Sequence, residues 1–250
     1  METEKRHLRI KLTELETEDR KARLAHCPGI TLDMLTDGAL GLTVKDHREM
    51  QDFANSLIQQ LGQAARVEIT NSAGTNILMS VERRPFFTDT IIDWKRLSWM
   101  NMPTGEVTVA PVEDSLEGEL ICDMAIGGIG PIKTAVGITA KDGKAEKTES
   151  QDDRVLRRVD ESLRTDSRAK IVGEFAFGIN PKARFVEEFL EAEKILGTVH
   201  IAFGNNSDMP GGKNPSSNHM DFLISKPTVK IINTDNSAFE VLVNGTFKSL

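Results

Sequence analysis

The segment GGKNPSSNHMD, residues 211–221, places His219 and Asp221 two positions apart. A loop rich in Gly, Pro, Ser and Asn precedes them, and the following MDFLIS run predicts a strand. Side chains alternate between the two faces of a strand, so residues two apart share a face. The segment therefore predicts an imidazole beside a carboxylate, a pair that suits a hard or borderline divalent metal ion.

Three further polar residues lie inside apolar runs, each of which predicts a buried or half-buried strand. They are Glu106 in MPTGEVTVAPV, Glu174 in IVGEFAF and His200 in TVHIAF. Any one of them alone is more often a hydrogen-bonded core residue, but a buried charge needs a partner because an unpaired one is costly. With His219 and Asp221 they form a nitrogen and oxygen ligand set that suits zinc, cobalt, manganese or ferrous iron.

Two more residues are candidate catalytic groups. The segment PKARFVEEFLEAEKILG predicts a helix over residues 181–197, with Pro at its start and Gly at its end. Glu193 lies at the edge of the apolar stripe of this helix. There it either has a functional role, orienting a ligand or carrying a proton, or is a solvated residue beside Lys194. Lys213 lies in the Gly-rich run next to the metal pair, where it either meets an anionic substrate or is ordinary surface.

The remaining elements predict a mixed α+β fold. Helices are expected at residues 47–62 and 150–164, a polar helical leader at 1–26, and a hairpin turn at Asp142-Gly143. From about residue 106 the sequence becomes β-rich. We expect a smaller, helix-containing N-terminal α/β lobe over residues 1–100 and a larger lobe with a mixed sheet over 101–250, which carries the metal site.

Composition limits the classes of protein that remain. The 250 residues are 39% hydrophobic, enough to fill a core. The sequence has no run of about 20 apolar residues and its N-terminus is charged throughout, so we expect neither a membrane span nor a signal peptide, and a cytoplasmic location. Two cysteines, Cys27 and Cys122, favour a reducing compartment. The net charge of −7 disfavours nucleic-acid binding.

Four segments, in order, carry a resemblance to a known family: NMPTGEVTVAP, GEFAFGINPKA, EAEKILGTVHIAFG and GGKNPSSNHMD. They resemble signature segments of the thermophilic metalloaminopeptidases (the aminopeptidase T and aminopeptidase S group, peptidase family M29). They are equally similar to the related 2,5-dihydroxypyridine 5,6-dioxygenases. The resemblance covers roughly residues 20–250 and is strongest over 101–221.

The resemblance implies a pair of divalent metal ions, zinc, cobalt or manganese, and cleavage of peptide bonds by a metal-activated water. The residues that it implies as ligands are Glu106, Glu174, His200, His219 and Asp221.

Two departures from the family pattern accompany these matches. The family uses a tyrosine shortly after the histidine that matches His200, and this chain contains no tyrosine. Phe203, Asn205, Asn206 and Ser207 occupy that neighbourhood. Relatives also carry an additional N-terminal α/β region, so the chain is expected to be shortened there. Apolar surface exposed by the shortening is expected to be covered in a homo-oligomer.

Three functions remain open at this point. The first is a metal-dependent hydrolase that releases N-terminal amino acids from peptides or small amides. The second is a ring-cleaving dioxygenase that uses ferrous iron held by His200, His219 and Asp221 and acts on a dihydroxypyridine-like substrate. The third is a degenerate relative that binds a peptide without turnover.

Overall fold

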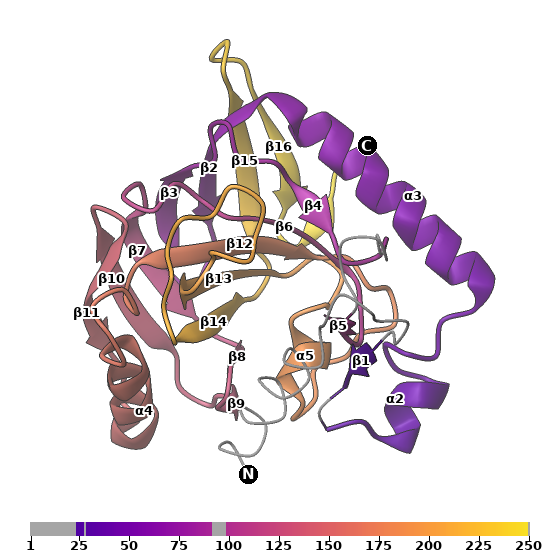
Figure 1. Ribbon diagram of the computed structural model, residues 1–250, viewed down its shortest axis with the longest axis horizontal. Coiled ribbons are helices and arrows are strands. Elements are labelled where there is room, and N and C mark those ends of the chain that lie inside the picture. The colour runs from indigo at the N-terminus through magenta and orange to yellow at the C-terminus, as the bar shows by residue number, and fades with distance from the viewer. Residues whose placement is uncertain (1–23, 28, 92–98, 250) are drawn as a thin grey trace, which may run out of the picture.

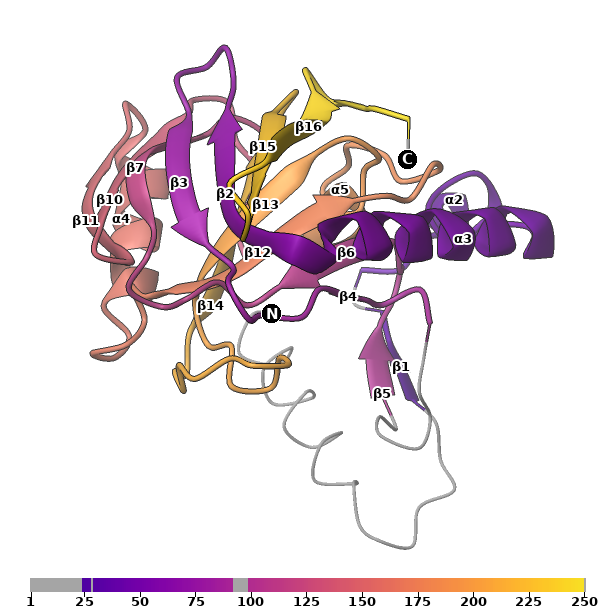
Figure 2. The ribbon, with the colours of Figure 1, turned by 90° about the horizontal axis from the view of Figure 1, so that it is seen from above.

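The computed structural model describes residues 24–27, 29–91 and 99–249, and two large sheets make up most of this part of the chain. The first sheet has eight strands in the order β11-β10-β7-β3-β2-β15-β16-β17, and the second has seven in the order β4-β6-β12-β13-β14-β8-β9. Within each of these two sheets, the paired strands are antiparallel to one another. Figures 1 and 2 show the two sheets as layers, with the helices α3 and α4 at opposite sides of them.

The strands of the first sheet are β2 (Ala64–Thr70), β3 (Asn76–Ser80), β7 (Glu117–Cys122), β10 (Val136–Lys141), β11 (Lys144–Glu149), β15 (Thr228–Asn233), β16 (Ala238–Val243) and β17 (Thr246–Phe247). The strands of the second sheet are β4 (Phe87–Thr88), β6 (Glu106–Val109), β8 (Ala125–Ile126), β9 (Gly130–Pro131), β12 (Val172–Gly178), β13 (Val199–Gly204) and β14 (His219–Ile224). A separate parallel pair joins β1 (Leu24–His26) to β5 (Trp99–Asn101).

Five short or medium helices complete the described elements: α2 (Leu32–Thr36), α3 (Val44–Gln60), a 3-10 turn at Leu61–Gln63, α4 (Asp153–Leu163) and α5 (Phe189–Ala192). The helix α3 begins with a capping box, in which the Thr43 hydroxyl accepts from the Asp46 N–H and the Asp46 carboxylate accepts from the Thr43 N–H. Its residues Met50, Ala54 and Leu57 are buried in the main core. No helix in the described residues is both long and apolar enough to cross a bilayer.

The main hydrophobic core combines side chains from both sheets with those of α3 and α4. Val67 and Met79 of the first sheet belong to the same buried cluster as Phe175 and Phe222 of the second, and Val159 of α4 joins them. Burial on one side of each sheet is what gives an antiparallel sheet its alternating pattern. The core therefore fixes which side of the second sheet remains available for a site.

The α+β fold expected from the sequence is confirmed. The helices expected at 47–62 and 150–164 correspond to α3 and α4, and the hairpin at Asp142-Gly143 joins β10 to β11. Both turn residues have positive φ, 48° and 74°, as a two-residue hairpin turn requires. Most of the leader expected at 1–26 lies outside the described residues, and Leu24–His26 forms a strand instead of a helix.

The long helix predicted over residues 181–197 was wrong, because only Phe189–Ala192 is helical. Side-chain contacts hold the preceding segment in another conformation. The Asn180 side-chain oxygen accepts from the N–H groups of Lys182 and Ala183, and Arg184 pairs with Asp33 and Glu191. Tertiary contacts of this kind override helix propensity.

The predicted lobes at 1–100 and 101–250 contribute strands to the same sheets. In the first sheet β2 pairs with β15, and in the second β4 pairs with β6. The division of the chain at residue 100 stays a prediction.

Candidate metal centre

Four adjacent strands of the second sheet bring the five predicted ligands to one face. Residues that are directly opposite in an antiparallel pair share a face. Glu106 is opposite Gly178, while His200 is opposite Ala176 and Ala202 is opposite both Glu174 and Asp221. His219 is opposite Gly204. The register therefore places all five side chains on the same face of β6, β12, β13 and β14.

The residues between the ligands have short side chains, and those on the other face are large and apolar. Ala176, Gly178, Ala202 and Gly204 lie on the ligand face and are buried. The other face supplies the core with Val107, Val109, Phe175, Phe177, Val199, Ile201, Phe203, Met220, Phe222 and Ile224. The apolar face fixes the register of these strands, because a slip of one residue would expose every one of these side chains.

A bulge in β12 aims Glu174 at the ligand face. Val172 is opposite Phe203 and Glu174 is opposite Ala202, so Gly173 is the extra residue. A Cβ at Gly173 would lie 2.7 Å from the carbonyl oxygen of Gly204, which explains the glycine. Without the extra residue, Val172 and Glu174 would share a face. The bulge lets Val172 enter the core while Glu174 faces the ligands.

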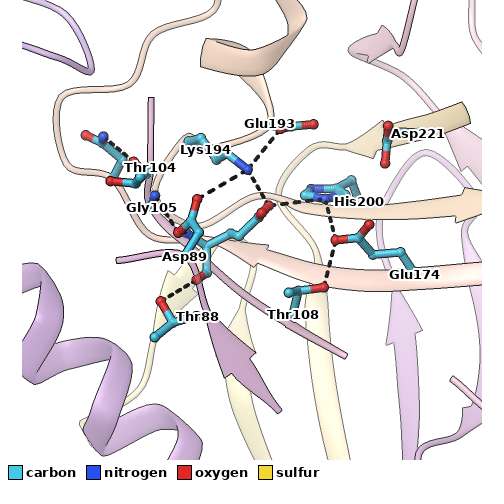
Figure 3. Close-up of polar contacts among 12 residues, drawn as sticks. Thr88, Asp89, Thr104, Gly105, Thr108, Glu174, Glu193, Lys194, His200 and Asp221 are labelled. Carbon is cyan, nitrogen blue, oxygen red and sulfur yellow. Dashed lines mark hydrogen bonds and ion pairs between the residues drawn. The ribbon is translucent and has the colours of Figure 1, made fainter. Parts of the chain in front are cut away.

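Six acid and imidazole groups converge into three overlapping sets. Each set offers ligand atoms that all lie within 4.8 Å of one another. The sets are Glu106, Glu174 and His200; Glu174, His219 and Asp221; and Glu193, His200 and Asp221. The structure thus brings together all five ligands expected from the sequence and adds Glu193 to them. Figure 3 shows Glu174, His200 and Asp221 from neighbouring strands, with Glu193 approaching from the segment that follows α5.

The two histidines have different second partners. His219 donates its Nδ1–H to the backbone carbonyl of Asn205 at 2.8 Å, and its Nε2 lies 3.1 Å from Glu174 and 3.4 Å from Asp221. A metal-binding histidine usually donates its other nitrogen to a carbonyl or carboxylate in this way. The Nε2 atom of His200 lies 3.6 Å from both Glu106 and Glu174, and its buried Nδ1 has no hydrogen-bond partner among the described residues.

These observations fit a divalent metal ion. The candidate ligand atoms in the three sets are imidazole nitrogens and carboxylate oxygens. A ligand set of this kind, without thiolates, suits zinc, cobalt, manganese or iron. Glu174 also accepts a 2.7 Å hydrogen bond from the Thr108 hydroxyl, which fixes the orientation of its carboxylate. The unpartnered Nδ1 of His200 and the bond of His219 to Asn205 add to this fit.

The electrostatics of the carboxyl groups differ sharply within this small volume. Burial alone would raise the pKa of Glu174, but hydrogen bonds and charge from His200 and His219 outweigh it and hold the pKa well below its usual value. Burial raises the pKa of Glu106 to about 8, against the lowering effect of Lys194. Burial likewise raises the pKa of Glu193, again with Lys194 acting in the opposite direction. Glu174 is therefore the most strongly ionised of the three.

The carboxylates around His200 and His219 favour the protonated forms of both imidazoles in the metal-free protein. Burial acts to lower the pKa of each, but Glu174 and the other nearby carboxylates outweigh it. They raise the pKa of His200 to about 9 and hold that of His219 well above its usual value. Metal ligation needs the neutral imidazole, so the metal must displace these protons.

We expect zinc binding at pH 7 to release a proton from each histidine that ligates the ion. Calorimetric titrations in two buffers of different ionisation enthalpy should give different apparent enthalpies, and the difference counts the protons released. Affinity should rise with pH through the neutral range, by about tenfold per pH unit for each proton displaced. An apparent enthalpy that is the same in both buffers at pH 7 would show that the imidazoles are already neutral.

A buried ammonium group, which the sequence did not single out, lies among these carboxylates. The Lys194 Nζ atom is 2.6 Å from Glu106, 2.9 Å from Glu193 and 3.6 Å from Asp89. Burial lowers the pKa of Lys194, but these carboxylates outweigh it and raise the pKa well above its usual value. Asp89 in turn accepts hydrogen bonds from the backbone N–H groups of Gly105 and Glu106. Glu193 is therefore a buried, paired group, and its interpretation as a solvated surface residue was wrong.

The two lysines near the site have other partners. Lys213 is exposed, and its backbone N–H donates to Glu113 at 2.7 Å. Among the described contacts its ammonium does not meet the five ligands, so a catalytic role for Lys213 stays a prediction. The Lys182 ammonium donates to the carbonyl of Gly41 and pairs with Asp46, at the start of α3.

The residues that follow His200 have structural partners. Phe203 is in the core, and the Asn206 amide donates to Glu113. The Asn205 side chain donates to Asp208 and accepts from Ser207, while its carbonyl orients His219. The neighbourhood in which the family resemblance implies a tyrosine thus helps to position a ligand and to hold the segment after β13 in place.

Two solved structures have the same fold as this chain. A 2,5-dihydroxypyridine dioxygenase from Pseudomonas putida KT2440 matches with a TM-score of 0.69 and 17% identity, over 84% of this chain and 61% of that one. AmpT from Thermus thermophilus matches with a TM-score of 0.68 and 21% identity, over 82% of this chain and 56% of that one. The chain therefore spans less than two thirds of the length of either protein. No curated protein sequence matches it.

A family model described as thermophilic metalloprotease (M29) matches residues 43–247, which include every ligand candidate. The match extends over most of the 250 residues. Its span and the convergence of the acid and imidazole groups agree with the resemblance seen in the sequence. The chain belongs to the thermophilic metalloprotease (M29) family.

Proposed function

We propose that this chain is a metal-dependent hydrolase that releases N-terminal amino acids from peptides or small amides. One observation carries the proposal: five acid and imidazole side chains on four adjacent strands share one face and belong to overlapping sets of three whose ligand atoms lie within 4.8 Å of one another. When bound there, a divalent metal ion polarises a carbonyl group and lowers the pKa of a water molecule so that hydroxide forms near neutral pH.

The protein residues supply binding, orientation and proton transfer. Glu174, His219 and Asp221 form one set that would hold a metal, with Thr108 and the Asn205 carbonyl fixing the orientations of Glu174 and His219. Glu193 belongs to a set with His200 and Asp221, and burial raises its pKa toward the range where a carboxyl group can both take and return a proton. We assign it the transfer of the proton from the attacking water to the leaving amine.

A surplus of carboxylates in the site supports the choice of substrates with a free amino terminus. Once a divalent ion has displaced the protons of the histidines that it contacts, five carboxyl groups of this cluster face the ion and the Lys194 ammonium: Glu106, Glu174, Glu193, Asp221 and Asp89. A protonated α-amino group is a cation that such a site attracts, whereas an acetylated terminus carries no charge. The substrate class is therefore a peptide or small amide with a free amino end.

The test compares metal-stripped and reconstituted protein. We expect no turnover of a panel of aminoacyl amides and short peptides without metal, and release of free amino acid after addition of zinc, cobalt or manganese. N-acetylated versions of the same substrates are the matched control and should not be cleaved. Inactivity of every reconstituted sample toward the whole panel would refute the hydrolase proposal.

The ring-cleaving dioxygenase remains the second candidate, since one neighbour of the same fold is a 2,5-dihydroxypyridine dioxygenase. Its expected iron ligands, His200, His219 and Asp221, share a face, but they are not one of the three close sets found among the described residues. The hydrolase therefore ranks first. Oxygen uptake by the Fe(II)-loaded protein with a dihydroxypyridine would reverse this order. The non-catalytic peptide-binding reading predicts a site that retains little or no metal, so stoichiometric metal would count against it.

A further inference from the structure

The ammonium group of Lys194 lies where the carboxylates of the site are closest together. Its side chain is 3% exposed, and its Nζ atom contacts one oxygen each of Glu106, Glu193 and Asp89, at 2.6, 2.9 and 3.6 Å. Figure 3 shows the contacts of this nitrogen with Asp89 and Glu193. A cation surrounded by three carboxylate oxygens has the surroundings that a bound metal ion would otherwise have.

The backbone holds Lys194 in this position. Its carbonyl accepts from the N–H of Asn180 at 2.9 Å and its own N–H donates to Glu191 at 3.1 Å. Asn180 is itself fully buried and its amide donates to the carbonyls of Ala39 and Thr104. Hydrogen bonds of both its N–H and its carbonyl therefore fix the backbone of Lys194, and the fold determines where its side chain enters the site.

Lys194 contacts members of only two of the three sets that could hold a metal. Glu106 belongs to the first set and Glu193 to the third, and both carboxylates pair with the lysine. The second set, Glu174, His219 and Asp221, includes no residue in a described ion pair with Lys194. A metal ion bound through Glu106 or Glu193 would lie close to the ammonium and be repelled by it, whereas the second set avoids this repulsion.

We propose that Lys194 takes the place of a second metal ion, so that the centre binds one divalent ion, at Glu174, His219 and Asp221. The inference rests on the metal centre of the proposed function and differs from the pair of ions that the family resemblance implies. Glu106 and Glu193 then serve to hold the lysine and to accept protons or the amino group of a substrate. A single ion with three protein ligands and open positions is a common form of hydrolytic centre.

The test counts metal ions per chain. Metal-stripped protein is equilibrated with excess Zn(II), freed of unbound ion, and analysed for zinc and for protein. We expect one equivalent for the wild type. In Lys194→Met, which keeps the length of the side chain but removes its charge, we expect two, because Glu106 and Glu193 then need a cation. Lys194→Arg keeps a cation and should return to one.

A surface ion pair supplies the matched control. Lys230 pairs with Glu68 at 2.9 Å in the other sheet, with both side chains partly exposed, so Lys230→Met should retain one equivalent. Two equivalents in the wild type would overturn the inference and leave the hydrolase proposal standing. One equivalent in a folded Lys194→Met variant would overturn the role of Lys194. No zinc in the wild type would refute the metal centre itself.

A second measurement keeps the inference testable if Lys194→Met fails to fold. The wild type is loaded with Co(II) to saturation and examined by electron paramagnetic resonance. One isolated Co(II) ion per chain gives a high-spin signal that grows in proportion to bound cobalt. A signal that instead falls as the last cobalt binds would reveal a spin-coupled pair and overturn the inference.

Discussion

The Glu174→Gln variant is expected to bind zinc at least about 100-fold more weakly than the wild type and to lose hydrolytic activity. Glu174 belongs to two of the three close sets and contacts both His200 and His219. Loss of a group that only supports a ligand typically costs about 10–100-fold in metal affinity, and loss of a ligand should cost more. Calorimetric titration of the metal-stripped variant with Zn(II) measures the effect.

Two further variants separate ligation from general damage. The Glu240→Gln variant makes the same chemical change at an exposed residue of β16. This variant should bind zinc with the same affinity as the wild type. Thr108→Val removes only the hydroxyl that orients Glu174, so the expected loss lies between the two, about 10–100-fold. Unchanged zinc affinity in a folded Glu174→Gln protein would remove Glu174 from the metal centre.

The Gly105→Ala variant is expected to lower the free energy of unfolding by roughly 2–4 kcal/mol. Gly105 has φ of +132°, which side-chain-bearing residues rarely adopt, and an added Cβ would lie 2.5 Å from the Cβ of Asn180. Asn180 is fully buried, so it has little room to move away. Strain and overpacking add together, and the melting temperature should fall by roughly 4–16 °C in thermal unfolding followed by circular dichroism.

Gly62→Ala is the matched control for this prediction. Nothing lies within 4 Å of the Cβ that alanine would add at Gly62, and this glycine is not among those with positive φ. Its melting temperature should be unchanged or slightly higher, because alanine restricts the unfolded chain. If Gly105→Ala melts at the same temperature as the wild type, the loop before Glu106 does not need a glycine, and the expected strain and overpacking at this position are wrong.

The ligand strands could be predicted because their polar residues interrupt apolar runs of period two. His219 and Asp221 share a face, as their spacing requires. The placement of Glu174 needed more, since a bulge at Gly173 separates it from Val172 and no local pattern announces the extra residue. Convergence of strands that are distant in sequence follows from register and core packing, which single-sequence periodicity does not encode.

The conformation of the segment between β12 and β13 could not be predicted from the sequence. Helical spacing over residues 181–197 indicated a long helix, but ion pairs and an Asn180 cap hold most of it in another form. Lys194 carried no signal of its own in the sequence, although it is buried among three carboxylates. Asp89 carried no signal at all, because it follows the two-residue strand β4 in an ordinary polar segment. The expected homo-oligomer stays a prediction.

Hydrogen bonds between consecutive strands, rather than the connections between them, align the five ligand side chains. Connections only need to reach from one strand to the next, so they can lengthen or shorten while the ligands keep their alignment. A single inserted residue within β13 would instead turn His200 to the apolar side, since each step along a strand reverses the direction of the side chain. Lineages built on this scaffold are therefore free to diverge in their loops, while selection holds the lengths of these strands fixed.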